Sequence, residues 1–142
     1  MAEVNFFYEN IDFRIEKKRK IKHWIENILT RERYKREFRV SYIFCSDSFL
    51  SVINRQYLHH TSLTDIITFS LADTEDEIEG EVYISIDRVR ENSNKFDVLF
   101  ETELYRVIVH GILHLLGYKD KTGKEKEKMR RLEESYIKMM II

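Results

Sequence analysis

The chain contains 142 residues, a length that suits one domain with a substantial core and is short for two domains. Hydrophobic residues make up 43% of the chain and charged residues 35%, a composition that argues against disorder. The formal net charge of −1 argues against nucleic-acid binding by the whole surface, so any such binding would depend on local basic clusters.

The sequence contains no candidate membrane segment. Its longest apolar stretch, residues 107–116, is interrupted by two histidines and is shorter than the ~20 residues that a membrane helix requires. The first residues lack the basic start and the small-residue cleavage site of a secretory signal. We therefore expect no membrane association and a cytoplasmic location.

The first third of the chain predicts a strand, an amphipathic helix and two basic clusters. Residues 4–8 are typical of a short strand, and the apolar side chains of residues 21–29 have the spacing of one helix face. The basic clusters are Lys17, Lys18, Arg19, Lys20 and Lys22, and then Arg31, Arg33, Lys35, Arg36 and Arg39. Charge runs of this length are usually solvated surface, which is the simpler interpretation.

A second strand and a second helix are predicted next. Apolar and polar residues alternate over residues 38–44, as in a half-buried strand, and a helix capped by Ser46 or Asp47 is predicted as far as Tyr57. Cys45 is the only cysteine and cannot form an internal disulfide. Its place in the apolar run favours a buried, inert thiol over a catalytic one.

Two β-rich runs follow, over residues 65–71 and 81–86. The acidic stretch 73–77 and Gly80 separate them, which favours an antiparallel pair. Because the earlier strands alternate with helices, we expect a mixed sheet.

The last third of the chain predicts two helices. The first extends from residue 97 to residue 116, and its apolar residues surround the whole circumference after Arg106, so we expect it to be central and buried. Gly117 is placed to end it. Thr122 and Glu125 form a capping-box pattern at the start of the final helix. The apolar stripe of that helix contains Met129, Leu132, Tyr136 and Met139.

Two histidines, His110 and His114, are four residues apart on the central helix. Residues at this spacing share one helix face, so both imidazoles can reach one metal ion. Two core histidines hydrogen-bonded to the backbone are the competing interpretation. The apolar surroundings favour a shared metal, because buried ring nitrogens need partners.

Gly117 brings in a third candidate ligand. A turn at this glycine lets Asp120, six residues beyond His114, fold back to the same ion, as in the extended zinc-protease motif. Two imidazoles and one carboxylate leave a fourth tetrahedral position open, which is typical of a catalytic zinc site. We predict that His110, His114 and Asp120 bind one Zn²⁺ ion per chain, with iron compatible on ligand type alone.

These ligands predict metal-assisted hydrolysis, because zinc can activate water and polarise the bond under attack. Zinc proteases with the same histidine spacing have glutamate as general base after the first histidine, whereas this chain has Gly111. A peptidase is therefore disfavoured. We expect the glycine to open space beside the metal that suits a bulky phosphodiester.

Residues 110–120 resemble the signature of the YbeY family, the metal-dependent endoribonucleases of bacterial rRNA maturation. Residues 54–57 with 63–70, and then 80–85, are similar to two further blocks of that family, so the resemblance covers nearly the whole chain. It implies a single compact α+β domain over residues 1–142. In that domain a mixed sheet of about four strands would pack with about five helices, and the metal site would lie at the end of the central buried helix.

The resemblance also implies a function. Members of the family cleave single-stranded RNA with the help of zinc, and they are implicated in processing the 3′ end of small-subunit rRNA and in ribosome quality control. The implied partners are rRNA and the small ribosomal subunit or its assembly factors. The basic first third of the chain could then hold phosphates beside the metal.

The chain departs from the family pattern at four positions. The family usually has histidine where Asp120 stands and an acidic residue at Lys119, and it usually has arginine at Leu58 and proline at Leu63. A carboxylate still suits zinc. The arginine would stabilise phosphate, so its absence motivates a second hypothesis, a non-catalytic rRNA-binding assembly protein whose metal is structural. A metallopeptidase is the third hypothesis.

Other residues could compensate for the missing arginine. Arg55, one helical turn earlier, is a candidate catalytic residue beside His110 and His114. Candidate RNA-binding residues are Lys119, Lys121, His59 and His60. Taken singly, each of these is more often a solvated surface residue.

Overall fold

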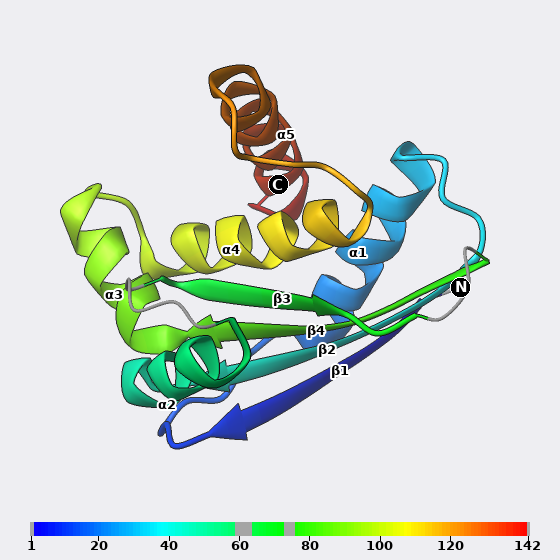
Figure 1. Ribbon diagram of the computed structural model, residues 1–142. Coiled ribbons are helices and arrows are strands. Elements are labelled where there is room, and N and C mark those ends of the chain that lie inside the picture. Colours follow the sequence, from blue (N-terminus) through cyan, green and yellow to red (C-terminus); the bar gives the residue numbers. More distant parts are fainter. Residues whose placement is uncertain (1, 59–63, 73–75, 142) are drawn as a thin grey trace.

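The structure is a computed structural model that describes residues 2–58, 64–72 and 76–141 (Figure 1). In chain order its elements are β1 (Ala2–Glu9), α1 (Lys18–Arg31), β2 (Glu37–Cys45), α2 (Asp47–Ile53), the π-helix η1 (Asn54–Leu58), β3 (Ile66–Ser70), β4 (Glu77–Ser85), α3 (Ile86–Lys95), α4 (Phe100–Leu115) and α5 (Gly123–Ile141). None of the helices in these ranges has the length and apolar character that crossing a membrane requires.

The four strands form one mixed sheet in the order β1-β2-β4-β3. β2 is parallel to both β1 and β4, whereas β3 is antiparallel to β4. The predicted antiparallel pair and mixed sheet are therefore confirmed. β1 and β3 are the two edges, and this order determines which surface residues can lie near the candidate ligands.

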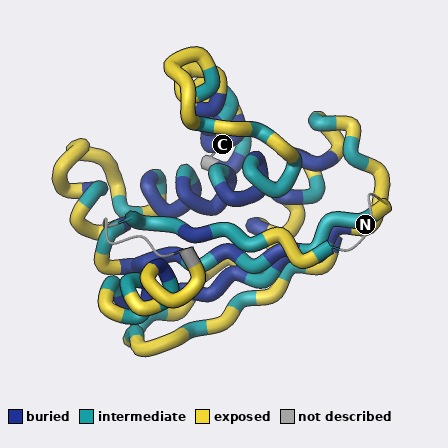
Figure 2. The backbone as a smooth tube through the Cα atoms, in the orientation of Figure 1, coloured by how far each residue is buried: buried dark blue, intermediate teal, exposed yellow. Residues whose placement is uncertain are grey.

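The main core lies between one face of the sheet and the helices α1 and α4, with α5 packed on α4 (Figure 1). Figure 2 shows that α4 and the middle strands are the most buried parts of the chain. Phe38, Tyr42 and Phe44 of β2 are fully buried, and the Tyr42 hydroxyl donates to the Ile108 carbonyl at 2.9 Å. The prediction of a central, buried helix is confirmed.

The other face of the sheet has a smaller core under α2. Cys45, Leu50 and Ile67 are buried there. Burial, reinforced by the nearby carboxylates, raises the pKa of the Cys45 thiol to about 12. The predicted burial of the thiol is confirmed, and its inertness stays a prediction. Toward β1 this face is open, and Phe7 is 50% exposed.

Gly111 allows α4 to lie close to the sheet. A Cβ atom at this position would come within 2.9 Å of Val82 Cγ1 on β4, closer than real Cβ contacts permit. Gly80 on β4 has the matching role, since a Cβ there would meet Leu115 Cδ2 at 2.5 Å. The expectation that Gly111 opens space beside the ligands is wrong, because Val82 and Ile66 already fill that side.

Helix α3 is absent from the predicted elements. Ser85 caps it by accepting a hydrogen bond from the Arg88 backbone N–H at 3.1 Å, and only Ile86, Val89 and Ser93 are buried. An apolar stripe this narrow gives a weak periodic signal. The preceding strand, β4, was expected to continue into Ile86, which is instead the first residue of the helix.

Two further boundaries differ from the expected ones. The predicted second helix is α-helical only as far as Ile53 and continues as the π-helix η1. β4 begins at Glu77, four residues before the expected start, because Arg39 of β2 pairs with Glu77 and Glu79 at 3.1 and 3.5 Å. Charged pairs between neighbouring strands can lengthen a strand. Such a segment has no alternation of apolar and polar residues, so the sequence pattern does not predict it.

Candidate metal centre

The helix α4 presents His110 and His114 from adjacent turns, and the chain then reverses at Gly117. This glycine has a φ of +104°, a conformation that residues with a Cβ rarely adopt. The turn is closed by two backbone hydrogen bonds, from Gly117 N–H to the His114 carbonyl and from Tyr118 N–H to the Leu113 carbonyl, both 3.0 Å long. Asp120 consequently returns to the two histidines, as the sequence predicts.

The three side chains place their donor atoms in a small triangle. His110 Nε2 and His114 Nε2 are 3.0 Å apart, and each lies 3.4 Å from Asp120 Oδ2. Donor atoms bonded to zinc at about 2.1 Å with tetrahedral angles are about 3.4 Å apart. The two edges that end on Asp120 match this value, the edge between the histidines is shorter, and the three residues form a group that could hold a metal ion.

The loop that contains Asp120 is fixed at both ends. On one side, the Tyr118 hydroxyl donates to Glu32 Oε1 at 2.5 Å, just beyond the end of α1. On the other side, the predicted capping box is confirmed: Thr122 Oγ1 accepts from Glu125 N–H at 3.1 Å, and Glu125 Oε1 accepts from Thr122 N–H at 2.9 Å. The hydrogen bonds that the Glu125 carboxylate accepts from the backbone N–H groups of Thr122 and Lys121 lower its pKa.

Glu133 of α5 orients the ring of His110. Its Oε2 atom lies 2.6 Å from His110 Nδ1, so Nδ1–H donates to the carboxylate and Nε2 keeps its lone pair for a metal. Burial alone would lower the pKa of His110, but the hydrogen bond and charge of Glu133, together with Asp120, raise it above its ordinary value. Glu133 is itself buried, at 7% exposure, and pairs with Arg106 at 3.5 Å.

Sequence reasoning did not single out Glu133. The available signal was its position on α5, four residues after the buried Met129 and three before the buried Tyr136. A carboxylate in the middle of a core-facing stripe needs a buried partner. The partners here are His110 and Arg106, both on α4.

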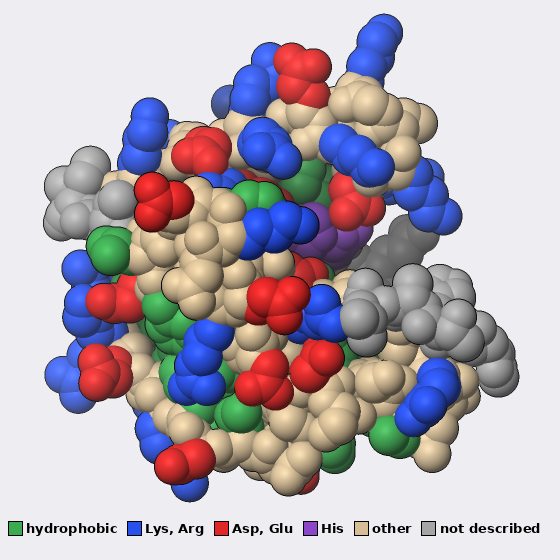
Figure 3. Space-filling view, turned by 90° about the vertical axis from the view of Figure 1, so that its left-hand side faces the viewer, with side chains coloured by type: hydrophobic (Ala, Val, Ile, Leu, Met, Phe, Trp, Pro, Cys, Tyr) green, Lys and Arg blue, Asp and Glu red, His purple; other side chains and the backbone are tan. Residues whose placement is uncertain are grey.

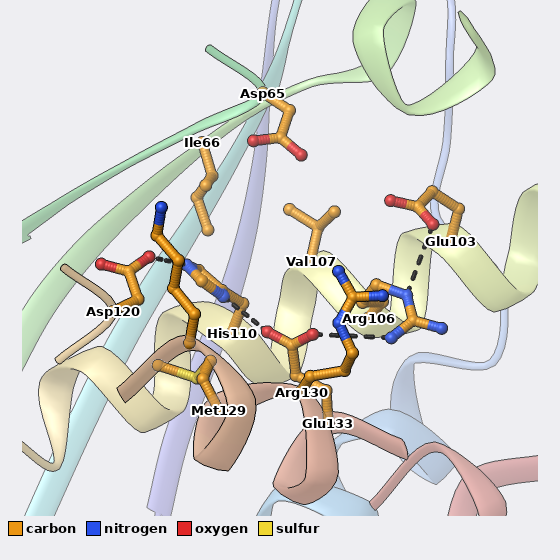
Figure 4. Close-up of a pocket in the computed structure, with 11 residues that line it drawn as sticks. Asp65, Ile66, Glu103, Arg106, Val107, His110, Asp120, Met129, Arg130 and Glu133 are labelled. Atoms are coloured by element: carbon orange, nitrogen blue, oxygen red, sulfur yellow. Dashed lines mark hydrogen bonds and ion pairs between the residues drawn. The ribbon is translucent and has the colours of Figure 1, made fainter. Parts of the chain in front are cut away.

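Two pockets meet at the candidate ligands. One, of about 280 Å³, lies between α4 and α5, and the other, of about 590 Å³, lies along β3. Asp65, Ile66, His110 and Asp120 line both. Figure 3 shows histidine in a hollow of the surface with acidic and basic side chains around it, and Figure 4 shows His110 and Asp120 together at one end of the smaller pocket.

Asp65 is a second acidic residue that sequence reasoning did not single out. It precedes β3 and lies across the pocket from α5 (Figure 4). Burial raises the pKa of its carboxyl, against the opposing effects of its own backbone N–H and of His110. The sequence contains it within the block that resembles the YbeY family, but no spacing relates it to the histidines.

The other predicted site residues lie away from the triangle or outside the described residues. Arg55 is exposed on η1, and Lys119 and Lys121 are exposed beside Asp120, but none of the three lines either pocket. Their roles stay predictions. His59 and His60 lie outside the described residues.

The first basic cluster is not beside the candidate ligands. Lys18, Arg19 and Lys22 line a separate pocket with residues of β1, at the edge of the sheet opposite β3. Lys17 pairs with Glu101 in the first turn of α4, 3.6 Å away, whereas His114 is in the last turn. For this cluster, the expectation that the basic first third holds phosphates beside the metal is therefore wrong, because strand order separates the two surfaces. For the second cluster it stays a prediction.

Comparison with known proteins agrees with this geometry. A family model described as endoribonuclease YbeY matches residues 4–141. The chain belongs to the YbeY family. Proteins called endoribonuclease YbeY from Amoebophilus asiaticus and Flavobacterium psychrophilum are 45% and 46% identical to it over 96% of this chain, and over 92% and 95% of their own lengths. The predicted family and enzyme class, endoribonuclease, are confirmed.

A solved structure supports the fold of this YbeY-family chain. The chain resembles the solution structure of TM1509 from Thermotoga maritima with a TM-score of 0.63 and 27% sequence identity. The match covers 99% of this chain and 89% of the other. The predicted α+β fold, with a four-stranded mixed sheet and five α-helices among the described residues, is confirmed.

Proposed function

We propose that the protein is a zinc-dependent endoribonuclease that cleaves single-stranded RNA and matures the 3′ end of small-subunit rRNA. The triangle formed by His110, His114 and Asp120 is the observation that supports the proposal most strongly, because two of its three edges fit tetrahedral zinc. The family and the names of its relatives support RNA as the substrate.

The donor set suits zinc. Imidazole nitrogen is a borderline donor and carboxylate oxygen a hard one, and zinc binds both; three protein ligands leave a position for water or substrate. A zinc ion bound there would supply a Lewis acid for the phosphodiester and activate water for hydrolysis.

The protein residues prepare the site for that ion. Glu133 keeps the proton of His110 on Nδ1, and Arg106 balances the buried charge of Glu133. Gly117 and the Tyr118–Glu32 hydrogen bond bring Asp120 to the histidines. The pockets on either side of the triangle give an RNA strand room to enter and leave.

The cellular setting is part of the proposal. A nuclease that matures small-subunit rRNA must meet the small ribosomal subunit or its assembly factors, so we propose these as partners and the cytoplasm as the location. The match of the YbeY family model to residues 4–141 is the basis for proposing these partners.

The test combines metal analysis with RNA cleavage. We expect the purified protein to contain about one zinc ion per chain and to cut single-stranded RNA, with both properties lost on His114→Ala. His23→Ala is the matched control, because the side chain of His23 is 72% exposed on α1. Cleavage that survives His114→Ala would contradict the proposal. Zinc and RNA binding without cleavage by the wild type would favour a non-catalytic assembly protein.

A second measurement tests the third ligand. We expect Asp120→Ala to reduce the zinc content, because Asp120 Oδ2 is equidistant from both histidine nitrogens. Lys119→Ala is the control, since Lys119 is exposed and lines neither pocket. Equal zinc content in wild type and Asp120→Ala would remove Asp120 from the ligand set.

A further inference from the structure

Two cations of α5, Lys126 and Arg130, line the smaller pocket beside His110 and Asp120. They are four residues apart and therefore on the same helix face. Both are exposed, and within the described residues neither has an ion pair. Figure 4 shows Arg130 extending from α5 into the pocket. These two side chains are therefore available for an anion.

The third cation of the pocket, Arg106, is already engaged. It contacts Glu103 and Glu133 at 3.5 Å and Glu134 at 2.7 Å. The single positive charge of Arg106 offsets part of the negative charge of Glu103 and Glu133, which reduces their repulsion of an anion in the pocket. The remaining acid besides Asp120 is Asp65, which lies on the β3 side, away from Arg130 (Figure 4).

The pocket continues along α4 away from the candidate ligands. A neighbouring pocket of about 200 Å³ shares four lining residues with it, among them Arg130 and Glu133, and extends to Phe96 and Val98. Phe96 is 58% exposed at the end of α3. From His110 back to Leu99, just before the start of α4, the helix rise is about 16 Å. We call these two joined pockets the α4–α5 groove.

The contents of the α4–α5 groove fit a nucleic-acid strand. A single strand of RNA binds through cations that contact its phosphates and aromatic side chains that stack on its bases. Both contacts form with any base sequence. Arg130 and Lys126 are the cations of the groove, and Phe96 is its aromatic side chain. A guanidinium can also bind two phosphate oxygens at once.

We propose that the α4–α5 groove binds the RNA strand on one side of the cleaved phosphate. Arg130, assisted by Lys126, binds a phosphate next to the reacting one, and Phe96 stacks on a base farther along. This inference rests on the proposed function, because it requires single-stranded RNA to reach the metal ligands.

The experiment measures RNA binding by the zinc-loaded protein. A fluorescent single-stranded oligoribonucleotide with phosphorothioate linkages, which resist hydrolysis, is titrated with each variant at several salt concentrations. Arg130→Ala is compared with Arg131→Ala, because Arg131 is the next residue, is exposed and lines neither part of the groove. Phe96→Ala is compared with Phe7→Ala, because Phe7 is 50% exposed on the opposite face of the sheet.

We expect Arg130→Ala to weaken RNA binding about tenfold, because it removes a charge-assisted hydrogen bond. The slope of log K against log salt should fall by about 0.7, the value for one phosphate contact of a single strand. Phe96→Ala should weaken binding about fivefold without changing the slope, because stacking releases no counterions. Both control variants should bind like the wild type.

Two results are decisive against the inference and can be told apart. If the wild type binds and cleaves single-stranded RNA but Arg130→Ala and Phe96→Ala match their controls, the groove assignment is wrong and the proposed function stands. If the wild type neither binds nor cleaves single-stranded RNA, the proposed function fails and the groove assignment fails with it.

Discussion

At the scale of single residues, Glu133 shows how a distant part of the chain adjusts a candidate ligand. It lies 23 positions after His110, yet its carboxylate accepts the Nδ1–H of that ring at 2.6 Å. The bond fixes the tautomer in which Nε2 faces His114 and Asp120. Partners of this kind commonly change metal affinity by 10- to 100-fold.

We therefore expect Glu133→Gln to lower zinc affinity by about 10- to 100-fold, because a neutral amide holds the His110 ring less firmly. Glu134→Gln is the control, since Glu134 contacts Arg106 at 2.7 Å but is half exposed and does not contact His110. Competition with a chromogenic chelator measures both affinities. Equal affinities would mean that Glu133 does not orient the ligand.

Cys45 gives a second prediction at this scale. Its pKa of about 12 leaves almost no thiolate at neutral pH, so a thiol reagent should modify the native protein far more slowly than the urea-unfolded protein. Because folding raises this pKa, the protonated thiol favours the folded state below pH about 9, and that contribution is lost as the pH rises toward 12. Rapid labelling of the native protein would contradict the burial of Cys45.

The residues of the candidate site differ in how visible they are in the sequence. His110, His114 and Asp120 follow from local spacing, because one helix and one turn hold all three. Glu133 and Asp65 do not, because their positions depend on how α5 and β3 pack against α4. Periodicity describes a single element and contains no information about which elements meet.

At the scale of elements, the contact between α4 and the sheet depends on Gly111. The helix is close enough to β4 that a single methyl group would overlap Val82. This closeness also sets the height of His110 and His114 above β3, whose residues line both pockets.

We expect Gly111→Ala to destabilise the protein by about 1–3 kcal/mol, because overpacking outweighs the gain in helix propensity. Gly123→Ala is the control, since no atom lies within 4 Å of a Cβ there, and it should be neutral or slightly stabilising. Urea denaturation measures both. If Gly111→Ala has the same free energy of unfolding as the wild type, α4 can move away from β4 without destabilising the protein.

The start of α5 gives a prediction of its own. Thr122→Ala removes the side chain that accepts the Glu125 N–H, and losing such a cap costs about 1 kcal/mol. Because Asp120 precedes the cap by two residues, zinc affinity should fall as well. Thr30→Ala serves as control in the same assays, because the Thr30 hydroxyl bonds only the Glu26 carbonyl on the exposed face of α1.

The sequence predicts the elements that have a clear apolar periodicity or a capping motif, and it does not predict those that lack both. The apolar circumference of α4 and the capping box of α5 identify both helices from the sequence. Helix α3 is short and buries few apolar residues, and the π-helical continuation of α2 depends on backbone hydrogen bonding that residue types do not specify.

At the scale of the whole molecule, strand order decides which surfaces can cooperate. Lys18, Arg19 and Lys22 of α1 lie near β1, whereas the candidate ligands lie near β3, with β2 and β4 between them. The sequence indicates a mixed sheet but not its order. That is why it could not show that Arg130, 20 residues after His110, is closer to the site than the conspicuous basic cluster.

The main core predicts how the protein responds to chelation. Its buried side chains lie between the sheet and the helices and do not include His110, His114 or Asp120. We therefore expect EDTA to leave the far-ultraviolet circular dichroism unchanged at 25 °C and to lower Tm by several degrees, because free zinc at 100 times Kd adds about 2.7 kcal/mol. Unfolding on chelation at 25 °C would instead indicate a structural metal.

The hydrogen bonds at Glu32 have a consequence for the synthesis of the protein. Both Tyr118 and Tyr136 donate to Glu32, and Trp24 donates to the Tyr136 carbonyl at 2.7 Å, so the last helix is anchored on the first. A nascent chain exposes His110 well before Glu133 has left the ribosome. The ring of His110 therefore gains its orienting partner only after α5 has been synthesised and has docked, so the candidate site is assembled last.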